Sequence, residues 1–95
     1  MRLELLPEAQ QDVREIVAYY KTLSSDLSLS FMASVADTLT RLEVFPQSGM
    51  LVGTHIRRVL VKHFPYSVFI RLKKMFCLIL SVAHIRRKPR DWDDR

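Results

Sequence analysis

The sequence has little cysteine, and this excludes several kinds of site. Cys77 is the only cysteine, so no disulfide can form within the chain. The three histidines and the single thiol follow no familiar zinc-ligand spacing, and we expect neither a metal ion nor a cofactor. Cys77 lies in the apolar run 76–80 with no histidine or acid beside it, which indicates a buried structural thiol.

Long hydrophobic runs, repeats and linkers are also lacking. The longest apolar stretch, 75–85, contains Ser81 and His84 and is shorter than the roughly 18–20 residues that span a bilayer. The N-terminus lacks the basic-then-apolar order of a signal peptide. We therefore expect a soluble, cytoplasmic protein with no membrane partner, forming one domain over residues 1–95 with a charged C-terminal tail at 83–95.

Charge is distributed unevenly along the chain. Residues 1–50 contain four Lys or Arg and seven Asp or Glu, a net charge of −3. Residues 51–95 contain eleven Lys or Arg and three Asp, a net charge of +8. This asymmetry indicates an anionic macromolecular partner for the second half, although a basic surface that only keeps the protein soluble is the alternative.

The first half has the pattern of a short strand followed by two helices. Residues 2–6 alternate weakly, and Pro7 and Glu8 suit the first turn of a helix. Ser25 is the predicted N-cap of the second helix, and Asp37 and Arg41 are spaced to form an ion pair on it. Glu8, Asp12 and Glu15 are expected on the solvated side of the first helix. Apolar residues at helical spacing form two stripes: Ala9, Val13, Ile16, Val17, Tyr20 and Leu23, then Leu27, Phe31, Val35, Leu39, Leu42 and Phe45.

The second half changes to a period of two. After a loop, the segments 57–63, 66–72 and 75–85 predict a three-stranded antiparallel meander, with the last strand central because it is apolar on both faces. The expected fold is α+β, in the order β-α-α-β-β-β, with both helices packed on one face of the sheet.

Alternation assigns the strand residues to two faces. The face expected to receive the helices carries Val59, Val61, Tyr66, Val68, Ile70, Phe76, Leu78, Leu80 and Val82. The opposite face is expected to carry Arg58, Leu60, Lys62, Ser67, Phe69, Arg71, Cys77, Ile79 and Ser81. Arg58, Lys62 and Arg71 are thus predicted to share one surface, where their charges would meet an anion.

Four segments, in this order, resemble the RelE/ParE superfamily of bacterial toxins. They are A-x-x-D-V-R-E-I-V-A-Y-Y at 9–20, L-E-V-F-P-Q-S-G at 42–49, R-x-x-x-x-x-F-P-Y-x-V-F-x-R at 58–71, and V-A-H-I-R-R-K-P-R-D-W-D-D-R at 82–95. Together they cover almost the whole chain. The ending H-x-x-R-x-P-x-x-W-x-x-R is most similar to the ParE-type, plasmid-stabilisation branch.

The resemblance implies the toxin of a type II toxin–antitoxin pair. Such a toxin binds a macromolecular target, DNA gyrase for ParE-like members, and a cognate ParD-like antitoxin neutralises it in a hetero-oligomer. Antitoxins of this superfamily wrap the toxin with a helix and an extended segment, so the exposed side of the helical hairpin and a sheet edge are the expected acceptors.

A RelE-like ribonuclease that cleaves messenger RNA on the ribosome is the alternative. Metal-free RNA cleavage needs a general base, an acid and cations around the phosphate. In that reading the catalytic residues would be Arg58, Arg71 and His84. RelE-like enzymes often use a late Tyr or His, whereas here no Tyr follows Tyr66 and Trp92 lies in the tail, where indole is only a donor. We therefore lean towards a protein that is not an enzyme.

In the favoured reading the same basic residues, with the tail, bind the target. Trp and Arg are enriched among the residues that dominate binding energy at interfaces. A third hypothesis, a plain nucleic-acid-binding module, is weaker because Phe69 is the only aromatic expected on the open face. The predicted target-binding residues are Arg58, Lys62, Arg71, Arg86, Arg87, Arg90 and Trp92.

Overall fold

A computed structural model describes residues 1–86 of the 95-residue chain. The elements in chain order are β1 (Arg2–Leu5), α1 (Pro7–Leu23), α2 (Ser25–Val44), β2 (Met50–Leu51), β3 (Ile56–Leu60), β4 (Tyr66–Leu72) and β5 (Phe76–His84). The predicted α+β class and β-α-α-β-β-β order are confirmed. The structure adds the short strand β2 within the predicted loop, and β5 lies within the segment 75–85 that was predicted as the last strand.

The helical hairpin begins and ends at the expected signals, with one correction. Pro7 starts α1, where its missing N–H needs no partner, and Glu8 lies in the first turn. The N-cap of α2 is Ser24 rather than the predicted Ser25. The Ser24 hydroxyl accepts a hydrogen bond from the backbone N–H of Leu27 at 3.3 Å, and its own N–H closes α1 on the Tyr20 carbonyl. One extended residue therefore ends one helix and caps the next.

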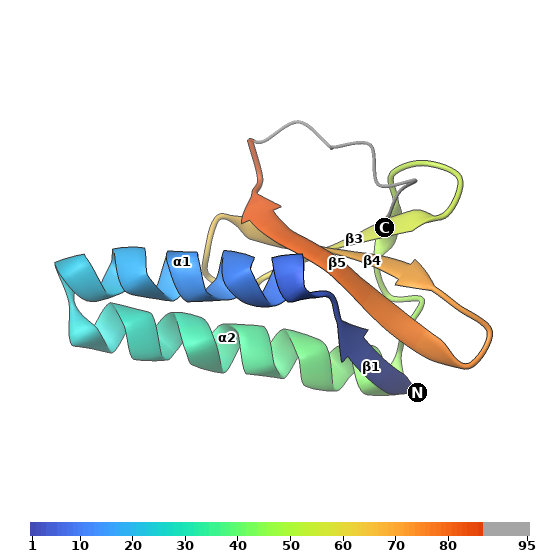
Figure 1. Cartoon of the computed structure of the whole chain (residues 1–95), viewed down its shortest axis with the longest axis horizontal. Helices are drawn as coiled ribbons and strands as arrows, with labels where there is room; N and C mark the ends of the chain where they lie inside the picture. The colour runs from blue at the N-terminus through green and yellow to red at the C-terminus, as the bar shows by residue number, and fades with distance from the viewer. Residues whose placement is uncertain (87–95) are drawn as a thin grey trace.

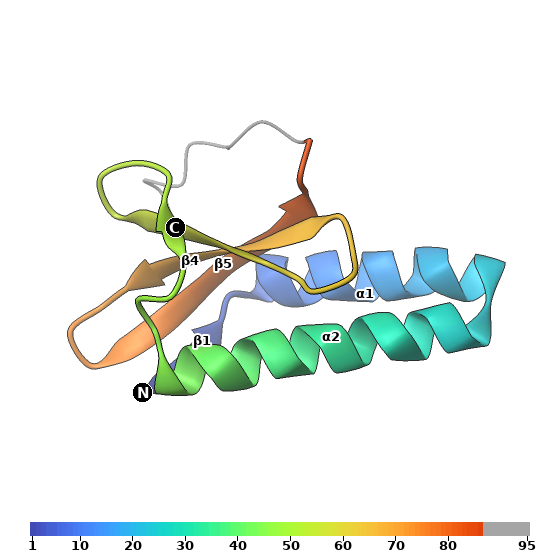
Figure 2. The same ribbon diagram turned by 180° about the vertical axis from the view of Figure 1, so that it is seen from behind.

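The sheet has five strands in the order β1-β5-β4-β3-β2. β1 pairs in parallel with β5, and the other neighbours are antiparallel. β5 is thus an internal strand along its first half, as its apolar composition predicts. Figures 1 and 2 show both helices side by side along one face of the sheet, antiparallel to each other.

A β-bulge in β5 overturns part of the predicted face assignment. Phe69 pairs with Ser81 and Ile70 pairs with Ile79, so Leu80 is an extra residue in β5. An extra residue reverses the alternation on one side of the bulge. Cys77 and Ile79 therefore face the helices, whereas Leu78 and Leu80 lie on the opposite face. Strict alternation predicted the reverse for all four residues.

The main core fills the space between the helices and the sheet. Its centre is aromatic: the ring of Phe31, fully buried, lies 5.3–5.6 Å from the rings of Tyr20, Phe64 and Tyr66. These contacts tie the far end of the hairpin to the β3–β4 turn. Leu3 and Leu5 from β1 pack against the same core, whose fully or nearly buried members are Ala9, Phe31, Val35, Leu42, Val61, Val68, Ile70, Cys77, Ile79 and Val82.

A smaller apolar cluster lies on the other face of the sheet. Phe69, Leu80 and Ala83 are buried there and pack with partly buried Leu6, Val52, Ile56 and Leu78. Both faces of the sheet are therefore partly apolar. Within the described residues, neither helix combines the length and the apolar character that crossing a membrane would require.

Candidate functional site

Arg58 and Arg71 lie on the sheet face opposite the helices, as predicted. Arg58 pairs with Phe69 and Arg71 pairs with Ile56, and both partners belong to the smaller apolar cluster on that face. The two arginines are diagonal neighbours on adjacent strands, a relation that places Cβ atoms roughly 7–8 Å apart. Both side chains are half-buried, and among residues 1–86 neither has a carboxylate within ion-pair distance. The pair is therefore suited to binding an anion.

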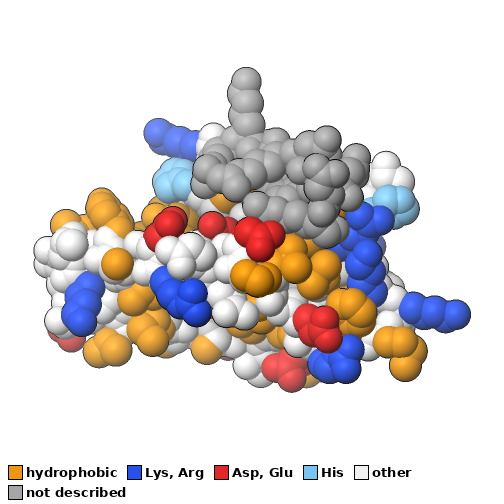
Figure 3. All heavy atoms as spheres, in the orientation of Figure 1, with side chains coloured by type: hydrophobic (Ala, Val, Ile, Leu, Met, Phe, Trp, Pro, Cys, Tyr) orange, Lys and Arg blue, Asp and Glu red, His pale blue; other side chains and the backbone are white. Residues whose placement is uncertain are grey.

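Lys62 does not extend this face as a strand residue. β3 ends at Leu60, and Lys62 and His63 form the exposed turn before β4. His63, the residue after Lys62, has a φ of 70°, a left-handed conformation typical of a turn. The turn, not the pleat of the strand, therefore sets the direction of Lys62. Figure 3 shows Lys and Arg side chains gathered over the sheet end of the molecule, with more hydrophobic surface over the helical end.

His84 lies away from the two arginines. It pairs with Tyr66 at the end of β5, and the two rings are 5.5 Å apart in an edge-to-face arrangement. The β5 partner of Arg71 is Leu78, six residues before His84, so Arg71 and His84 are separated by roughly 20 Å along the strand. Arg58 pairs with Phe69, which is three residues from the His84 partner Tyr66, or roughly 10 Å along β4. His84 also belongs to the helix side, where it lines a small cavity of about 150 Å³ with Asp12, Glu15 and Tyr66.

The hydrogen bonding of His84 is local. Its Nδ1 accepts the backbone N–H of Arg86 at 3.1 Å, which leaves Nε2 as its other polar atom. Arg86 itself is exposed. The structure thus brings Arg58 and Arg71 together but does not bring His84 to them. Three of the predicted target-binding residues, Arg87, Arg90 and Trp92, lie outside the described residues.

Asp12 is a polar residue whose role the sequence analysis missed. It was expected on a solvated helix face, but its Oδ2 accepts hydrogen bonds from the Ser81 hydroxyl at 2.9 Å and the Val82 N–H at 3.0 Å. β1 pairs with β5 only as far as Ile79, so Asp12 satisfies the edge of β5 just beyond β1. No local signal could reveal this contact because its partners are about seventy residues apart in the chain.

Two titratable groups in or beside the core have raised pKa values, which favours their neutral forms. Burial raises the pKa of the Cys77 thiol to about 11, so it is a poor nucleophile. Burial, followed by the neighbouring Tyr66, also raises the pKa of Tyr20 above its usual value. Within the part of the chain that the structure describes, no three His, Cys, Asp or Glu side chains gather in a way that could hold a metal ion.

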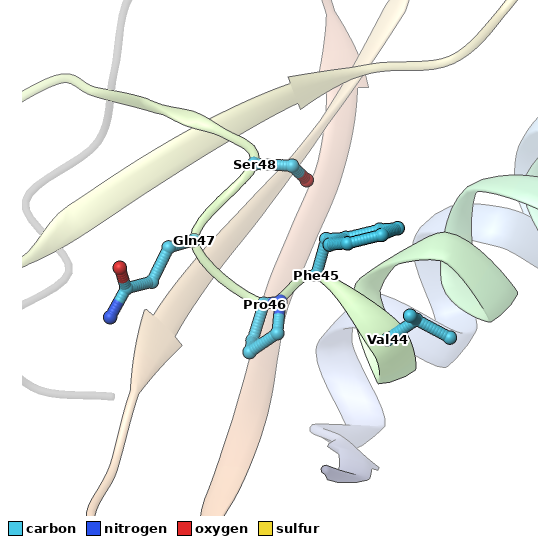
Figure 4. A pocket seen from close by; sticks show the side chains of 5 residues that line it. All are labelled: Val44, Phe45, Pro46, Gln47 and Ser48. Carbon is cyan, nitrogen blue, oxygen red and sulfur yellow. The ribbon is translucent and has the colours of Figure 1, made fainter.

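An open groove runs beside the end of α2. One pocket, of about 460 Å³, is lined by the consecutive residues 44–48, shown in Figure 4. A second pocket, of about 310 Å³, shares Ser48 with the first and is otherwise lined by Arg41, Met50, Arg58, Val59 and Leu60. Both pockets are lined by Ser48 and lie between the α2 exit and the β2–β3 edge, and we call them together the α2-exit groove. Arg58 therefore belongs to both the arginine pair and this groove.

Comparison with known proteins identifies the family of this chain. A family model described as "ParE toxin of type II toxin-antitoxin system, parDE" matches residues 3–89. A solved structure titled "Chromosomal ParDE TA system from P. aeruginosa" has a similar fold, with a TM-score of 0.77 and 20% sequence identity over 88% of this chain and 95% of that one. A search of curated proteins found no match. Because the family model covers nearly the whole sequence, this chain belongs to the ParE toxin family of type II toxin–antitoxin systems.

Proposed function

We propose that the protein inhibits growth by binding DNA gyrase and that a cognate ParD-like antitoxin, with which it forms a hetero-oligomer, neutralises it. The observation that carries this proposal is the match to the ParE toxin family over residues 3–89. The similarity of fold to a chain of a ParDE system supports it. The family description names a toxin–antitoxin system, which also supports a neutralising partner.

The arginine pair supports a target-binding surface on the open face of the sheet. Arg58 and Arg71 are half-buried on rigid, paired strands, so less side-chain entropy is lost when they bind than for arginines on a loop. An arginine on such a platform can form paired hydrogen bonds with a carboxylate or phosphate of the target. We include Lys62, Arg86 and the tail residues Arg87, Arg90 and Trp92 in the proposed surface.

The positions of the candidate catalytic residues favour binding over RNA cleavage. A general base must lie within hydrogen-bonding reach of the proton that it removes, close to the cations that stabilise the phosphate. His84 is on the helix side of the sheet, roughly 20 Å along the strand from Arg71. A ribonuclease built from Arg58, Arg71 and His84 would require these residues to act on one phosphate from two faces.

Induced expression in bacteria tests the proposal. The chain is expressed from a tightly regulated promoter, and growth, plasmid supercoiling and messenger-RNA integrity are followed in one culture. We expect growth to stop with altered or cleaved DNA and intact transcripts, and to resume when the product of the neighbouring reading frame is co-expressed. Cut transcripts with normal DNA would instead identify a ribonuclease.

Substitutions can distinguish a residue that binds the target from one that only supports the fold. Arg71→Ala should reduce toxicity at equal protein level, whereas Arg14→Ala, which removes an exposed arginine from α1, should leave it unchanged. His84→Ala is the discriminating variant. A gyrase-binding toxin should tolerate it, and a ribonuclease that uses His84 as a base should lose roughly 100-fold or more of its cleavage rate.

A further inference from the structure

The hairpin formed by β4 and β5 projects from the sheet end of the molecule. Figure 1 shows its turn extending beyond the helices at that end. The N–H of Lys73 donates to the Phe76 carbonyl at 2.9 Å, so the two residues between them, Lys74 and Met75, form the turn. Met75 is 77% exposed, more than any other large apolar side chain of the described residues. The hairpin therefore presents an apolar tip beside a lysine.

Strand register places three cations behind this tip on one face of the sheet. Arg58 and Arg71 are diagonal neighbours on the face opposite the helices. Lys73 is two residues after Arg71, and its hydrogen bond to Phe76 continues the ladder past the end of β4. Because alternate residues of a strand lie on the same face, Lys73 joins the two arginines there. The basic hairpin surface, as we call it, consists of Arg58, Arg71, Lys73, Lys74 and Met75.

No acid offsets these charges within their own part of the chain. The sequence contains no Asp or Glu from residue 44 to residue 90. Among residues 1–86, Glu4 of the nearby strand β1 pairs with Arg2 at 2.9 Å, and no carboxylate lies within ion-pair distance of the four cations of the basic hairpin surface. Arg71 and Lys73 are half-buried, as is usual for basic side chains whose stems pack on a sheet while their charged ends stay in water. The surface therefore attracts a polyanion.

We propose that the basic hairpin surface binds duplex DNA. Its tip enters the major groove, and the three cations behind the tip contact phosphates at the rim. The major groove of B-DNA is about 12 Å wide and about 8.5 Å deep and admits a two-stranded β-ribbon, whereas the minor groove, about 6 Å wide, is too narrow. At roughly 3.4 Å per residue, Arg71 lies roughly 10 Å behind Lys74. Arg71 therefore comes level with the phosphates when the tip reaches the floor of the groove.

This inference goes beyond the proposed function, because it concerns contact of the chain with DNA itself and holds whether or not gyrase is the target. We expect the binding to depend little on base sequence. The turn has no Asn, Gln, Asp or Glu side chain, and the Met75 side chain can contact bases only through apolar surface. Phosphate contacts dominate binding of this kind and make it sensitive to salt.

The dimensions of the hairpin argue against other anionic partners. Duplex RNA has a deep, narrow major groove that side chains cannot read, so the tip could not enter it. A stable protein interface buries roughly 800 Å² on each partner, far more than a turn with one exposed methionine presents. An anionic lipid surface offers phosphates but no groove for the tip. By contrast, a few phosphate contacts are enough for weak binding to DNA, with a dissociation constant of roughly 10⁻⁴–10⁻⁶ M.

Fluorescence anisotropy of a labelled duplex of about 20 base pairs and mixed sequence tests the inference with the full chain. We expect binding at about 25 mM KCl, and the logarithm of the association constant should fall with the logarithm of the salt concentration, with a slope of roughly −3 for three phosphate contacts. Arg71→Gln and Lys73→Gln should each weaken binding about tenfold or more and reduce the slope by about one. Met75→Ser should weaken binding without changing the slope, because it removes apolar contact and no charge.

The controls separate the surface from the general charge of the protein. Lys21→Gln removes an exposed lysine from α1, far from the hairpin, and should bind DNA within about twofold of the wild type. Vesicles of phosphatidylglycerol and phosphatidylcholine and an RNA duplex of the same sequence serve as competing partners, and both should bind more weakly than the DNA. Unfolding midpoints of all variants identify any that fail to fold.

Three results would overturn the inference. They are no binding of the wild type at about 25 mM KCl, equal affinities and slopes for the wild type and the three hairpin variants, and tighter binding to the vesicles or the RNA than to the DNA. The proposed function is decided separately. A chain that binds DNA through the hairpin but does not arrest growth would keep this inference and refute the toxin, and growth arrest through gyrase without DNA binding would do the reverse.

Discussion

The carboxylate of Asp12 on α1 accepts a hydrogen bond from the Ser81 hydroxyl on β5 at 2.9 Å, across 69 positions of sequence. The same oxygen also accepts the Val82 N–H at 3.0 Å. This link fixes α1 against the sheet where β1 no longer pairs with β5, and it lies beside the bulge at Leu80. The first helix is thus oriented by a polar contact as well as by its apolar stripe.

Replacing Asp12 should destabilise the fold. Asp12→Ala leaves the Ser81 hydroxyl and the Val82 N–H without their acceptor, and we expect a loss of about 1–3 kcal/mol in the free energy of unfolding. Denaturant titration followed by circular dichroism measures it. Glu15→Ala, one turn further along the exposed surface of α1, is the control and should change stability by less than about 0.5 kcal/mol. Equal losses for the two variants would contradict a structural role for Asp12.

Gly49 should not tolerate even a methyl group. A Cβ at this position would lie 2.7 Å from Val59 Cγ2 and 2.9 Å from the Arg58 carbonyl oxygen, so the loop would have to move away from β3. We expect Gly49→Ala to cost about 1–3 kcal/mol. Gly53→Ala is a matched control because a Cβ there meets nothing within 4 Å, and it should be neutral or stabilise by up to about 1 kcal/mol. Thermal unfolding of the two variants side by side decides the matter, and a neutral Gly49→Ala would refute the packing argument.

The start of α2 can be located by two serine substitutions. Ser24→Ala removes the side-chain acceptor of the Leu27 N–H and should cost about 1 kcal/mol. Ser25→Ala changes the first helical residue, whose side chain caps nothing in the described structure, and should cost little. Urea midpoints of both variants give the comparison. A larger loss at Ser25 would restore the N-cap predicted from sequence.

Cys77 should not react with thiol reagents in the folded protein. It is fully buried with a pKa of about 11, so a thiol reagent at pH 8 should label it only as fast as the chain unfolds. In 6 M guanidinium chloride, one thiol per chain should react at once. Rapid labelling of the native protein would show that the helix face of β5 opens readily.

The Cys77 thiol should make the free energy of unfolding fall at high pH. Its pKa is raised on folding from 9.0 to about 11, so the unfolded chain loses this proton first as pH rises. The stability that the protonated thiol contributes is complete below pH 9 and is lost as pH rises through 9 towards 11, by about 2 kcal/mol. The difference between wild type and Cys77→Ala, measured from pH 8 to 11, isolates this contribution because the other groups titrate in both proteins.

The periodicity of apolar residues was sufficient to predict an element where the burial of each residue depends only on its own helix or strand. The stripes at 9–23 and 27–45 identified both helices, and alternation identified β3 and β4 within a few residues. Alternation failed in β5 because one inserted residue, Leu80, exchanges the faces on which Leu78 and Cys77 lie. The hydropathy pattern could not reveal the bulge, because a strand that is apolar on both faces has the same pattern with or without an inserted residue. The Ser24 cap was missed by one position because adjacent serines carry the same local signal.

In the candidate site, too, the sequence pattern placed some residues correctly and failed for others. Arg58 and Arg71 were placed on one face correctly, since paired strands with no bulge between them preserve alternation. Lys62 was assigned to that face too, but β3 ends at Leu60 and Lys62 lies in the turn that follows. The α2-exit groove was not foreseen as a site at all, because it forms only when the end of α2, the loop and the β3 edge come together.

The sequence by itself determined the α+β class, the order of the elements, the separation of charge between the two halves and the resemblance to ParE-type toxins. All of these depend on local periodicity, composition or short motifs. Only the tertiary structure decided the parallel pairing of β1 with β5, the reversal of faces at Leu80, the role of Asp12 and the separation of His84 from the arginine pair. The physical reason is that strand register and contacts between distant residues depend on the packing of the whole chain, and the cost of a misplaced residue appears only once its neighbours are in place.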